Sequence, residues 1–276
     1  MYLRPTTLDQ AVDALEHHRA QVLAGGTDFY PALGERLPST PVVDITAVAE
    51  LKGISVHETF FRIGGLTTWS ELLTAQLPPC FDALKSAARE IGGVQIQNRG
   101  TVAGNLCNAS PAADSVPPLL ALDAEVELVS SGGTRRVSLA DFIVGNRKTL
   151  RRADELLTAV IVPRVVENAR SVFLKLGARR YLVISIAMVA IVLAIDEQRR
   201  IRNIRIAVGS CSARAQRLRE LEQVLTGRPA QARLDALVMP EHVKSLSPID
   251  DVRATAAYRS DAALTLVRRA LQMCVS

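Results

Sequence analysis

The feature that most constrains this chain is its longest irregular stretch, which runs from Val94 to Pro118 and is rich in glycine, asparagine, serine and proline. Long stretches without regular structure are usually functional or disordered. Apolar flanks and alternating small residues favour an ordered loop here. Its amide and hydroxyl side chains can offer a large ligand many neutral hydrogen bonds. A well-bonded structural loop has the same composition, so the stretch alone leaves both interpretations open.

A second loop carries paired glycines between a short strand and a helix start, in the run Leu23-Ala24-Gly25-Gly26-Thr27-Asp28-Phe29-Tyr30. Glycine allows positive φ angles and a close approach of backbone to ligand. Free N–H groups at a helix start favour an anion such as a pyrophosphate. The loop matches neither the GxGxxG nor the GxxxxGK[ST] pattern. A Gly-Gly turn is more often only a turn, so this loop alone does not establish a phosphate site.

The first part of the chain alternates short strands with helices. Thr7 and Gln10 predict a capped helix whose apolar face holds Leu8, Ala11, Val12 and Leu15, and Thr68 with Glu71 caps another. The other expected elements are strands at 21–24, 41–45, 60–63 and 156–162, a helix at 81–91 and a hairpin at 125–139.

The pattern changes after Pro163. Three strand-like runs, at 172–176, 183–195 and 201–208, come before helical patterns at 213–225 and 251–273. Strands followed by helices predict an α+β module with an antiparallel sheet, here of three strands. We therefore expect a domain boundary near residue 165, with domains at 1–165 and 166–276.

The net charge of +5 comes mainly from arginines in the second half of the chain, which raises the question of nucleic acid binding. Aromatic residues make up only 4% of the chain, so few rings are available to stack on bases. We expect no nucleic-acid partner, and interpret the arginine pairs as a solvated face or a contact with an acidic partner protein.

The remaining composition predicts a cytoplasmic protein without a metal site of its own. The cysteines form no CxxC pair and the histidines are scattered, which argues against a zinc or iron–sulfur site and against a histidine-based catalytic cluster. The longest apolar run, Leu182 to Ile195, is shorter than the roughly 20 residues of a spanning helix, so we interpret it as a buried strand. The N-terminus lacks a signal-peptide pattern. These cysteines are Cys80, Cys107, Cys211 and Cys274, and the histidines are His17, His18, His57 and His242.

Taken together, the two loops resemble one family. The pairing of LAGGTDFYPAL with QIQNRGTVAGNLCNASPAADSVPPLLALDAEVEL resembles the FAD subunits of the xanthine dehydrogenase and carbon monoxide dehydrogenase family. The stretches FRIGGLTTWSELL, ADELLTAVIVP and FLKLGARR agree with it. The resemblance implies a two-part FAD-binding domain of the vanillyl-alcohol oxidase (PCMH) type, with subdomains at about 1–57 and 58–165. A smaller α+β domain of the carbon monoxide dehydrogenase flavoprotein type would follow at 166–276.

The resemblance also implies roles for individual residues, none of them catalytic. One side of the cradle would wrap the FAD pyrophosphate with backbone N–H groups, and consists of Leu23, Ala24, Gly25, Gly26, Thr27, Asp28, Phe29 and Tyr30. The other side is Thr101, Val102, Ala103, Gly104 and Asn105, with Thr101 and Asn105 donating to phosphate or ribityl oxygens. Because Ala103 stands where relatives often have glycine, the cradle would depend more on Gly100 and Gly104.

Three further residues complete the site that the resemblance implies. Asp114 would hydrogen-bond the adenosine or ribityl portion, and Leu157 would make a backbone contact. Lys175 matches a lysine near the pyrimidine edge of the flavin, where a positive charge would stabilise electron density on the reduced ring. A surface lysine at a strand end is the alternative for Lys175. Tyr181 could approach the flavin ring or be an aromatic at the edge of the sheet.

The implied function is electron transfer within a larger complex. A molybdopterin centre on a large subunit would oxidise the substrate, and two [2Fe–2S] clusters on a small subunit would pass the electrons to non-covalent FAD on this chain. NAD or another acceptor would then receive them, and the complex would be a dimer of heterotrimers. The alternatives are a stand-alone FAD-dependent oxidoreductase with the same FAD domain and an assembly protein that keeps the fold without the flavin.

Overall fold

The computed structural model describes residues 1–231 and 233–275, which form two compact units with interleaved sequence. The first unit contains Met1–Ala75, Gly93–Ala109 and Ala124–Val162. The second contains Gln76–Gly92, Ser110–Asp123 and the chain from Pro163 onward. The chain therefore crosses between the units several times before residue 163.

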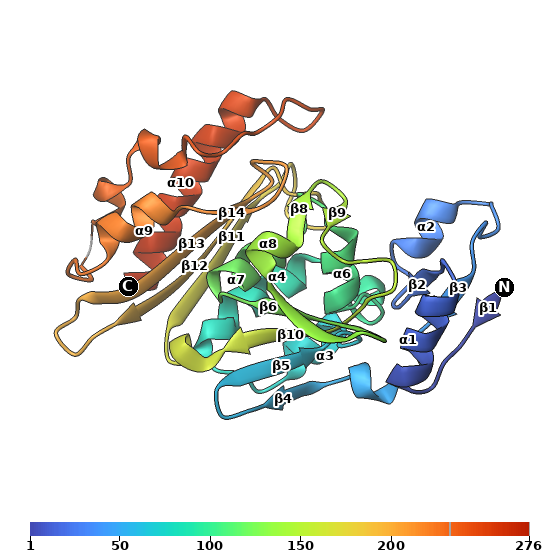
Figure 1. Ribbon diagram of the computed structural model, residues 1–276. Coiled ribbons are helices and arrows are strands. Elements are labelled where there is room, and N and C mark those ends of the chain that lie inside the picture. Colours follow the sequence, from blue (N-terminus) through green and yellow to red (C-terminus); the bar gives the residue numbers. More distant parts are fainter. Residues whose placement is uncertain (232, 276) are drawn as a thin grey trace. The chain divides into compact units, whose positions relative to one another are not determined.

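The first unit begins with a small parallel sheet covered by a helix (Figure 1). Strands β1 (Tyr2–Leu3), β3 (Val42–Asp44) and β2 (Gln21–Leu23) lie in the order β1-β3-β2. Helix α1 (Leu8–His17) packs Ala11 and Leu15 into the same apolar cluster as Val43 and Ile45. Thr7 caps α1 as predicted, by accepting a hydrogen bond from the Gln10 N–H.

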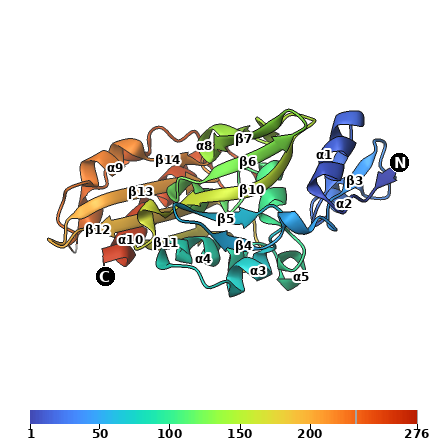
Figure 2. The same ribbon diagram turned by 60° about the horizontal axis from the view of Figure 1, so that its bottom comes forward.

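The rest of the first unit surrounds a five-stranded sheet in the order β4-β5-β10-β6-β7 (Figure 2). Its central strand β10 is buried along nearly all its length. The predicted hairpin is confirmed, because β6 and β7 pair from Glu125↔Ser138 to Ser130↔Gly133. The strands are β4 (Ile54–Val56), β5 (Phe60–Gly64), β10 (Leu156–Pro163), β6 (Glu125–Ser130) and β7 (Gly133–Ser138). The first unit also contains α2 (Phe29–Leu33), η1 (Ala49–Leu51), α3 (Trp69–Thr74), α5 (Val94–Gln97), α6 (Val102–Asn108), α8 (Leu139–Phe142), β8 (Ile143–Gly145) and β9 (Lys148–Thr149).

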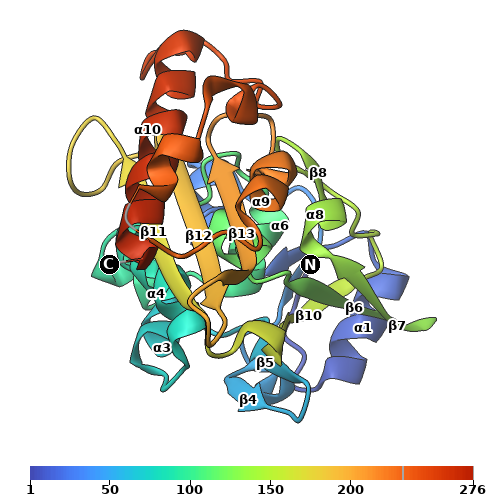
Figure 3. The ribbon, with the colours of Figure 1, turned by 90° about the vertical axis from the view of Figure 1, so that its left-hand side faces the viewer.

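The second unit is built on an antiparallel sheet in the order β11-β12-β13-β14, with α10 lying along its strands (Figure 3). The strands are β11 (Arg170–Leu176), β12 (Ala187–Ile195), β13 (Ile201–Gly209) and β14 (Gln216–Arg217). The helices are η2 (Pro79–Phe81), α4 (Asp82–Glu90), α7 (Val116–Ala121), η3 (Arg164–Val166), α9 (Arg219–Leu225), η4 (Leu234–Leu237), η5 (Pro240–Val243) and α10 (Ala256–Val275).

Strand β12 explains why this sheet has helices on both faces. Successive side chains of a strand point to opposite faces, and β12 is apolar at every position. Val189 and Ile191 share a core with Val267 and Leu271 of α10. Met188 points the other way, where Gly209 lets it pack close to Pro117 of α7. A strand that is buried on both faces has a continuous apolar sequence, as the run from Ala187 to Ile195 does.

Four sequence predictions need correction. The C-terminal sheet has four strands, not three, because β14 is only two residues long and leaves no periodic signal. The stretch from Val94 to Pro118 contains helices α5, α6 and the start of α7, which are too short to show helical periodicity. The strand expected at 183–195 begins only at Ala187, and the helix expected at 213–225 begins only at Arg219.

No helix among the described residues is long and apolar enough to cross a membrane.

Candidate functional site

The first unit carries a groove of about 630 Å³ that both sequence loops line. Its lining includes residues of the 23–30 loop and Thr101, which precedes α6. Residues that the resemblance had assigned to FAD and that line the groove are Leu23, Ala24, Gly25, Gly26, Thr27, Tyr30 and Thr101. Two segments that are about 70 residues apart in the chain thus share one surface, with a volume ordinary for a small-molecule site.

Close packing explains why Gly25 has to be glycine. A Cβ atom added to Gly25 would lie 1.9 Å from the carbonyl oxygen of Arg99, on the segment that leads into α6. Gly26 has a φ of +76°, in the left-handed region where residues with a side chain are strained. Among the described residues, the backbone N–H groups of Gly25, Gly26 and Thr27 donate no hydrogen bond. Three adjacent free donors in a groove suit an anionic ligand.

The other side of the predicted cradle is partly engaged within the protein. The Thr101 hydroxyl lines the groove and accepts a hydrogen bond from the Gly104 N–H at 3.1 Å, which caps α6. Val102 N–H donates to Thr67 at 3.0 Å and Ala103 N–H donates to Gly65 at 3.3 Å. Both side chains are buried. The threonine hydroxyl keeps its own proton to donate, since it only accepts from Gly104.

Five other predicted residues stand apart from the groove lining. Gly104 and Asn105 lie on α6 and are partly buried, while Asp28 directly precedes α2 and Phe29 begins it. Leu157 is buried on β10, and a Cβ on Gly65 would meet its carbonyl oxygen at 2.6 Å and the Ala103 side chain at 3.3 Å. Leu157 therefore lies close behind the start of α6.

The groove also contains a buried carboxylate that sequence reasoning missed. Asp44 accepts hydrogen bonds from the Tyr2 hydroxyl and from the backbone and side chain of Thr46, with Arg4 3.8 Å away. Burial acts to raise the pKa of Asp44, but these donors outweigh it and hold the pKa below its ordinary value. The carboxylate is thus ionised at neutral pH. Thr46 is two residues from Asp44 in the chain, but Tyr2 and Arg4 come from the distant N-terminal segment, so the sequence around Asp44 does not reveal this arrangement.

In the second unit, Asp114 and Lys175 form an ion pair that the sequence did not predict. Lys175 Nζ lies 2.6 Å from Asp114 Oδ2, and Ser185 Oγ donates to Asp114 Oδ1 at 2.5 Å. The side chains of Lys175 and Asp114 are each only 7% exposed, which excludes the surface-lysine alternative for Lys175. Burial raises the pKa of Asp114, and Lys175 and Ser185 oppose that rise by stabilising the carboxylate.

Lys175 opens onto a second groove, of about 480 Å³. Its lining includes Glu90 and Ser86 of α4 and the exposed arginines Arg179 and Arg180. Both charge signs are therefore present around the lysine.

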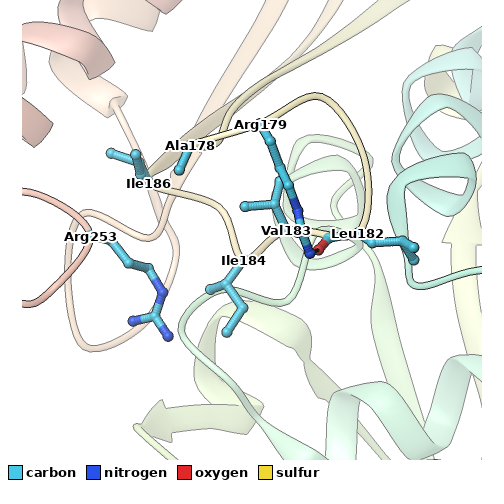
Figure 4. Close-up of a pocket in the computed structure, with 7 residues that line it drawn as sticks. All are labelled: Ala178, Arg179, Leu182, Val183, Ile184, Ile186 and Arg253. Atoms are coloured by element: carbon cyan, nitrogen blue, oxygen red, sulfur yellow. Dashed lines mark hydrogen bonds between the residues drawn. The ribbon is translucent and has the colours of Figure 1, made fainter.

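The loop after Lys175 also borders a smaller hollow of about 380 Å³, lined by Ala178, Arg179, Leu182, Val183, Ile184, Ile186 and Arg253 (Figure 4). The Arg179 guanidinium donates to the Leu182 carbonyl at 2.5 Å and so folds this loop back on itself. Tyr181, which was expected to approach the flavin or lie at the edge of the sheet, is 62% exposed, with the Arg180 guanidinium 5.1 Å from its ring centre. No group of three His, Cys, Asp or Glu side chains within 1–231 and 233–275 could hold a metal ion.

Comparisons with known proteins show the family to which the chain belongs. The family described as "FAD binding domain in molybdopterin dehydrogenase" matches residues 1–165, and "CO dehydrogenase flavoprotein C-terminal domain" matches residues 172–274. The nicotine 6-hydroxylase medium subunit of Paenarthrobacter nicotinovorans is 31% identical over 98% of this chain and 95% of its own length. The putative xanthine dehydrogenase FAD-binding subunit of Escherichia coli K12 is 30% identical over 100% of this chain and 96% of its own.

Solved structures are similar over nearly the whole chain. A chain of the cyanide-inactivated Cu,Mo-CO dehydrogenase superposes with a TM-score of 0.92 at 26% identity, covering 99% of this chain and 96% of its own. A chain of quinoline 2-oxidoreductase from Pseudomonas putida 86 gives 0.89 at 26% identity, with the same coverage.

The fold and the matches define the class: an FAD-binding subunit of a molybdenum-dependent oxidoreductase. The chain belongs to the xanthine dehydrogenase and carbon monoxide dehydrogenase family, as its medium, FAD-binding subunit. The family predicted from the sequence is confirmed. The residues present fit the cofactor, because the groove of the first unit offers adjacent free backbone donors at a site where Gly25 admits no side chain.

Proposed function

We propose that this chain relays electrons through non-covalent FAD. A small subunit with [2Fe–2S] clusters delivers the electrons, which a molybdopterin-containing large subunit takes from the substrate. NAD or another acceptor then removes them. The flavin supplies the redox chemistry when bound, so the chain itself needs no nucleophile or general base.

The observation that carries this proposal is the groove shared by the 23–30 loop and Thr101. Gly25, Gly26 and Thr27 present backbone N–H groups to the FAD pyrophosphate, and Thr101 donates its hydroxyl proton from the cap of α6. Leu23, Ala24 and Tyr30 complete this wall. The resemblance implies that seven further residues support or extend this wall: Asp28, Phe29, Val102, Ala103, Gly104, Asn105 and Leu157.

Asp114 and Lys175 serve the flavin end of the cofactor in this proposal. Asp114 holds the Lys175 ammonium, whose positive charge stabilises electron density on the reduced ring. The burial of this ion pair supports its assignment to the flavin. A buried ion pair is seldom favourable for stability alone, so its presence here favours a functional role.

The finer organisation follows the family. We propose a PCMH-type FAD domain at 1–165 with subdomains at about 1–57 and 58–165, a C-terminal domain at 166–276, and a cytoplasmic dimer of heterotrimers. The names of the relatives, nicotine 6-hydroxylase and xanthine dehydrogenase subunits, support N-heterocycles as the substrates of the complex.

The variant Gly25→Ala tests the groove. We expect it to lose bound FAD, because its methyl group would collide with the Arg99 carbonyl and displace the donor loop. Flavin released from the purified protein by heat is measured by absorption. Gly132→Ala is the matched control, since its Cβ would lie 3.6 Å from the nearest side-chain atom, in the exposed turn between β6 and β7. Normal flavin content in a folded Gly25→Ala protein would contradict the proposed groove.

A further inference from the structure

Three polar side chains from separate segments of the second unit form one buried row. Lys175 lies on β11, Asp114 precedes α7, and Ser185 lies just before β12. Each oxygen of the Asp114 carboxylate accepts from a different side chain, Oδ2 from Lys175 at 2.6 Å and Oδ1 from Ser185 at 2.5 Å. Ser185 is 1% exposed and the other two side chains are 7% exposed. Interactions in such a row are stronger than in water because solvent does not screen them.

The backbone around Ser185 is fixed without its hydroxyl. Ile186 N–H donates to the Leu176 carbonyl at 2.7 Å, one residue beyond Lys175. The buried Arg259 guanidinium donates to the Ile186 carbonyl at 2.6 Å. These contacts hold position 185 beside Asp114 whatever its side chain is. A buried hydroxyl at that position is useful chiefly for the bond that it donates to the carboxylate.

We propose that Ser185 is a positioning residue for the flavin, acting on Lys175 through Asp114. The inference rests on the proposed role of Lys175 and extends it to a residue that does not contact the lysine. The Ser185 O–H dipole neutralises part of the Asp114 charge and fixes the rotamer of its carboxylate. Lys175 therefore keeps a defined position and more of its positive field.

Loss of the hydroxyl has a predictable sign. Without Ser185 as donor, the Asp114 carboxylate presents more negative charge and pulls Lys175 more strongly toward itself. The net positive potential available to a reduced flavin then falls. The FAD reduction potential therefore shifts to a lower value in Ser185→Ala, in the same direction as in Lys175→Met but by less.

The test uses the FAD-loaded holoenzyme, with the flavin reduction potential as readout. Ser185→Ala is compared with Ser185→Cys, which keeps the volume but replaces the hydroxyl by a weak donor. Ser185→Thr restores the hydroxyl and should restore the potential. Ser171→Ala is the matched control: Ser171 lies on β11 with Lys175, but its hydroxyl bonds to Ala83 and Pro79. The double variant Ser185→Ala/Lys175→Met shows whether the serine acts through the lysine.

We expect Ser185→Ala and Ser185→Cys to lower the FAD reduction potential. Ser185→Thr and Ser171→Ala should leave the potential near its original value. In the Lys175→Met background, Ser185→Ala should cause no further change. If the Ser185→Ala protein is too unstable to purify, the Ser185→Cys variant tests the role of the hydroxyl by itself. A normal or raised potential in the serine variants, beside a lowered one in Lys175→Met, overturns this inference but not the role of Lys175. A serine effect that persists in the Lys175→Met background also overturns it. An unchanged potential in Lys175→Met removes both proposals.

Discussion

At the scale of single residues, the sequence predicted types of contact better than partners. The resemblance assigned Lys175 and Asp114 to the cofactor but did not show that they bond to each other, because they are 61 residues apart. The same limit applies to Asp44, whose partner Tyr2 is 42 residues away in the chain. Gly25 was expected to let the backbone come close to a ligand; the group that the structure places against it is the Arg99 carbonyl.

Asp251 gives a prediction about pH at this scale. Its hydrogen bonds from the Arg253 and Ala254 backbone, with the Arg259 side chain at 2.7 Å, lower the pKa of Asp251 from 3.8 to about 2. A carboxyl whose pKa is lower in the folded state stabilises the protein above the unfolded pKa and loses that contribution as pH falls. The difference in unfolding free energy between the protein and Asp251→Asn should therefore be largest above pH 4 and shrink toward pH 2.

Urea unfolding at several pH values measures this difference. The exposed Asp261 on α10 provides the control, since Asp261→Asn should change stability little at any pH. A difference for Asp251→Asn that stayed constant from pH 5 to pH 2 would mean that Asp251 is not stabilised as the ionised form.

At the scale of helices and strands, local signals predicted well wherever both partners are close in sequence. The capping box of Thr68 and Glu71 is present at the start of α3, and the hairpin turns at Ser131-Gly132. Helix α6 was missed because seven residues with Gly104 and Asn105 among them have low helix propensity. Its stability comes from the Thr101 cap and the burial of Val102 and Leu106, which depend on the fold.

Strand β14 and helix α9 depend on a buried charge network. Arg217 contacts Asp123 and bonds Glu222 at 2.7 and 2.8 Å, while Glu222 also accepts from the Ile206 N–H of β13. Removing one member of a buried charge pair leaves the other uncompensated. Arg217→Met should therefore lower the unfolding free energy by about 3 kcal/mol.

Chemical denaturation checks this value. Arg219→Met is the matched control: Arg219 is the exposed first residue of α9, and its replacement should cost under about 0.5 kcal/mol. Equal effects of the two replacements would show that the Arg217 network contributes no more than an exposed arginine.

At the scale of the whole molecule, the family and the α+β class were predictable, whereas the course of the chain was not. The two matched regions, 1–165 and 172–274, are continuous in sequence. The compact units are not, because residues 76–92 and 110–123 pack with the C-terminal sheet. Helices α4 and α7 lie in these two segments, and their apolar faces carried no sign of which sheet they would cover.

In the proposed complex, the flavin on this chain receives electrons from partner subunits and not from substrate. The most direct test compares flavin bleaching in the complex purified from its host with bleaching in the FAD-loaded chain alone. N-heterocyclic substrates are added without oxygen, and dithionite serves as a control that reduces any bound flavin. We predict that substrate bleaches the flavin only in the complex, while dithionite bleaches it in both. Bleaching of the flavin in the isolated chain by substrate would contradict the proposed transfer of electrons from partner subunits.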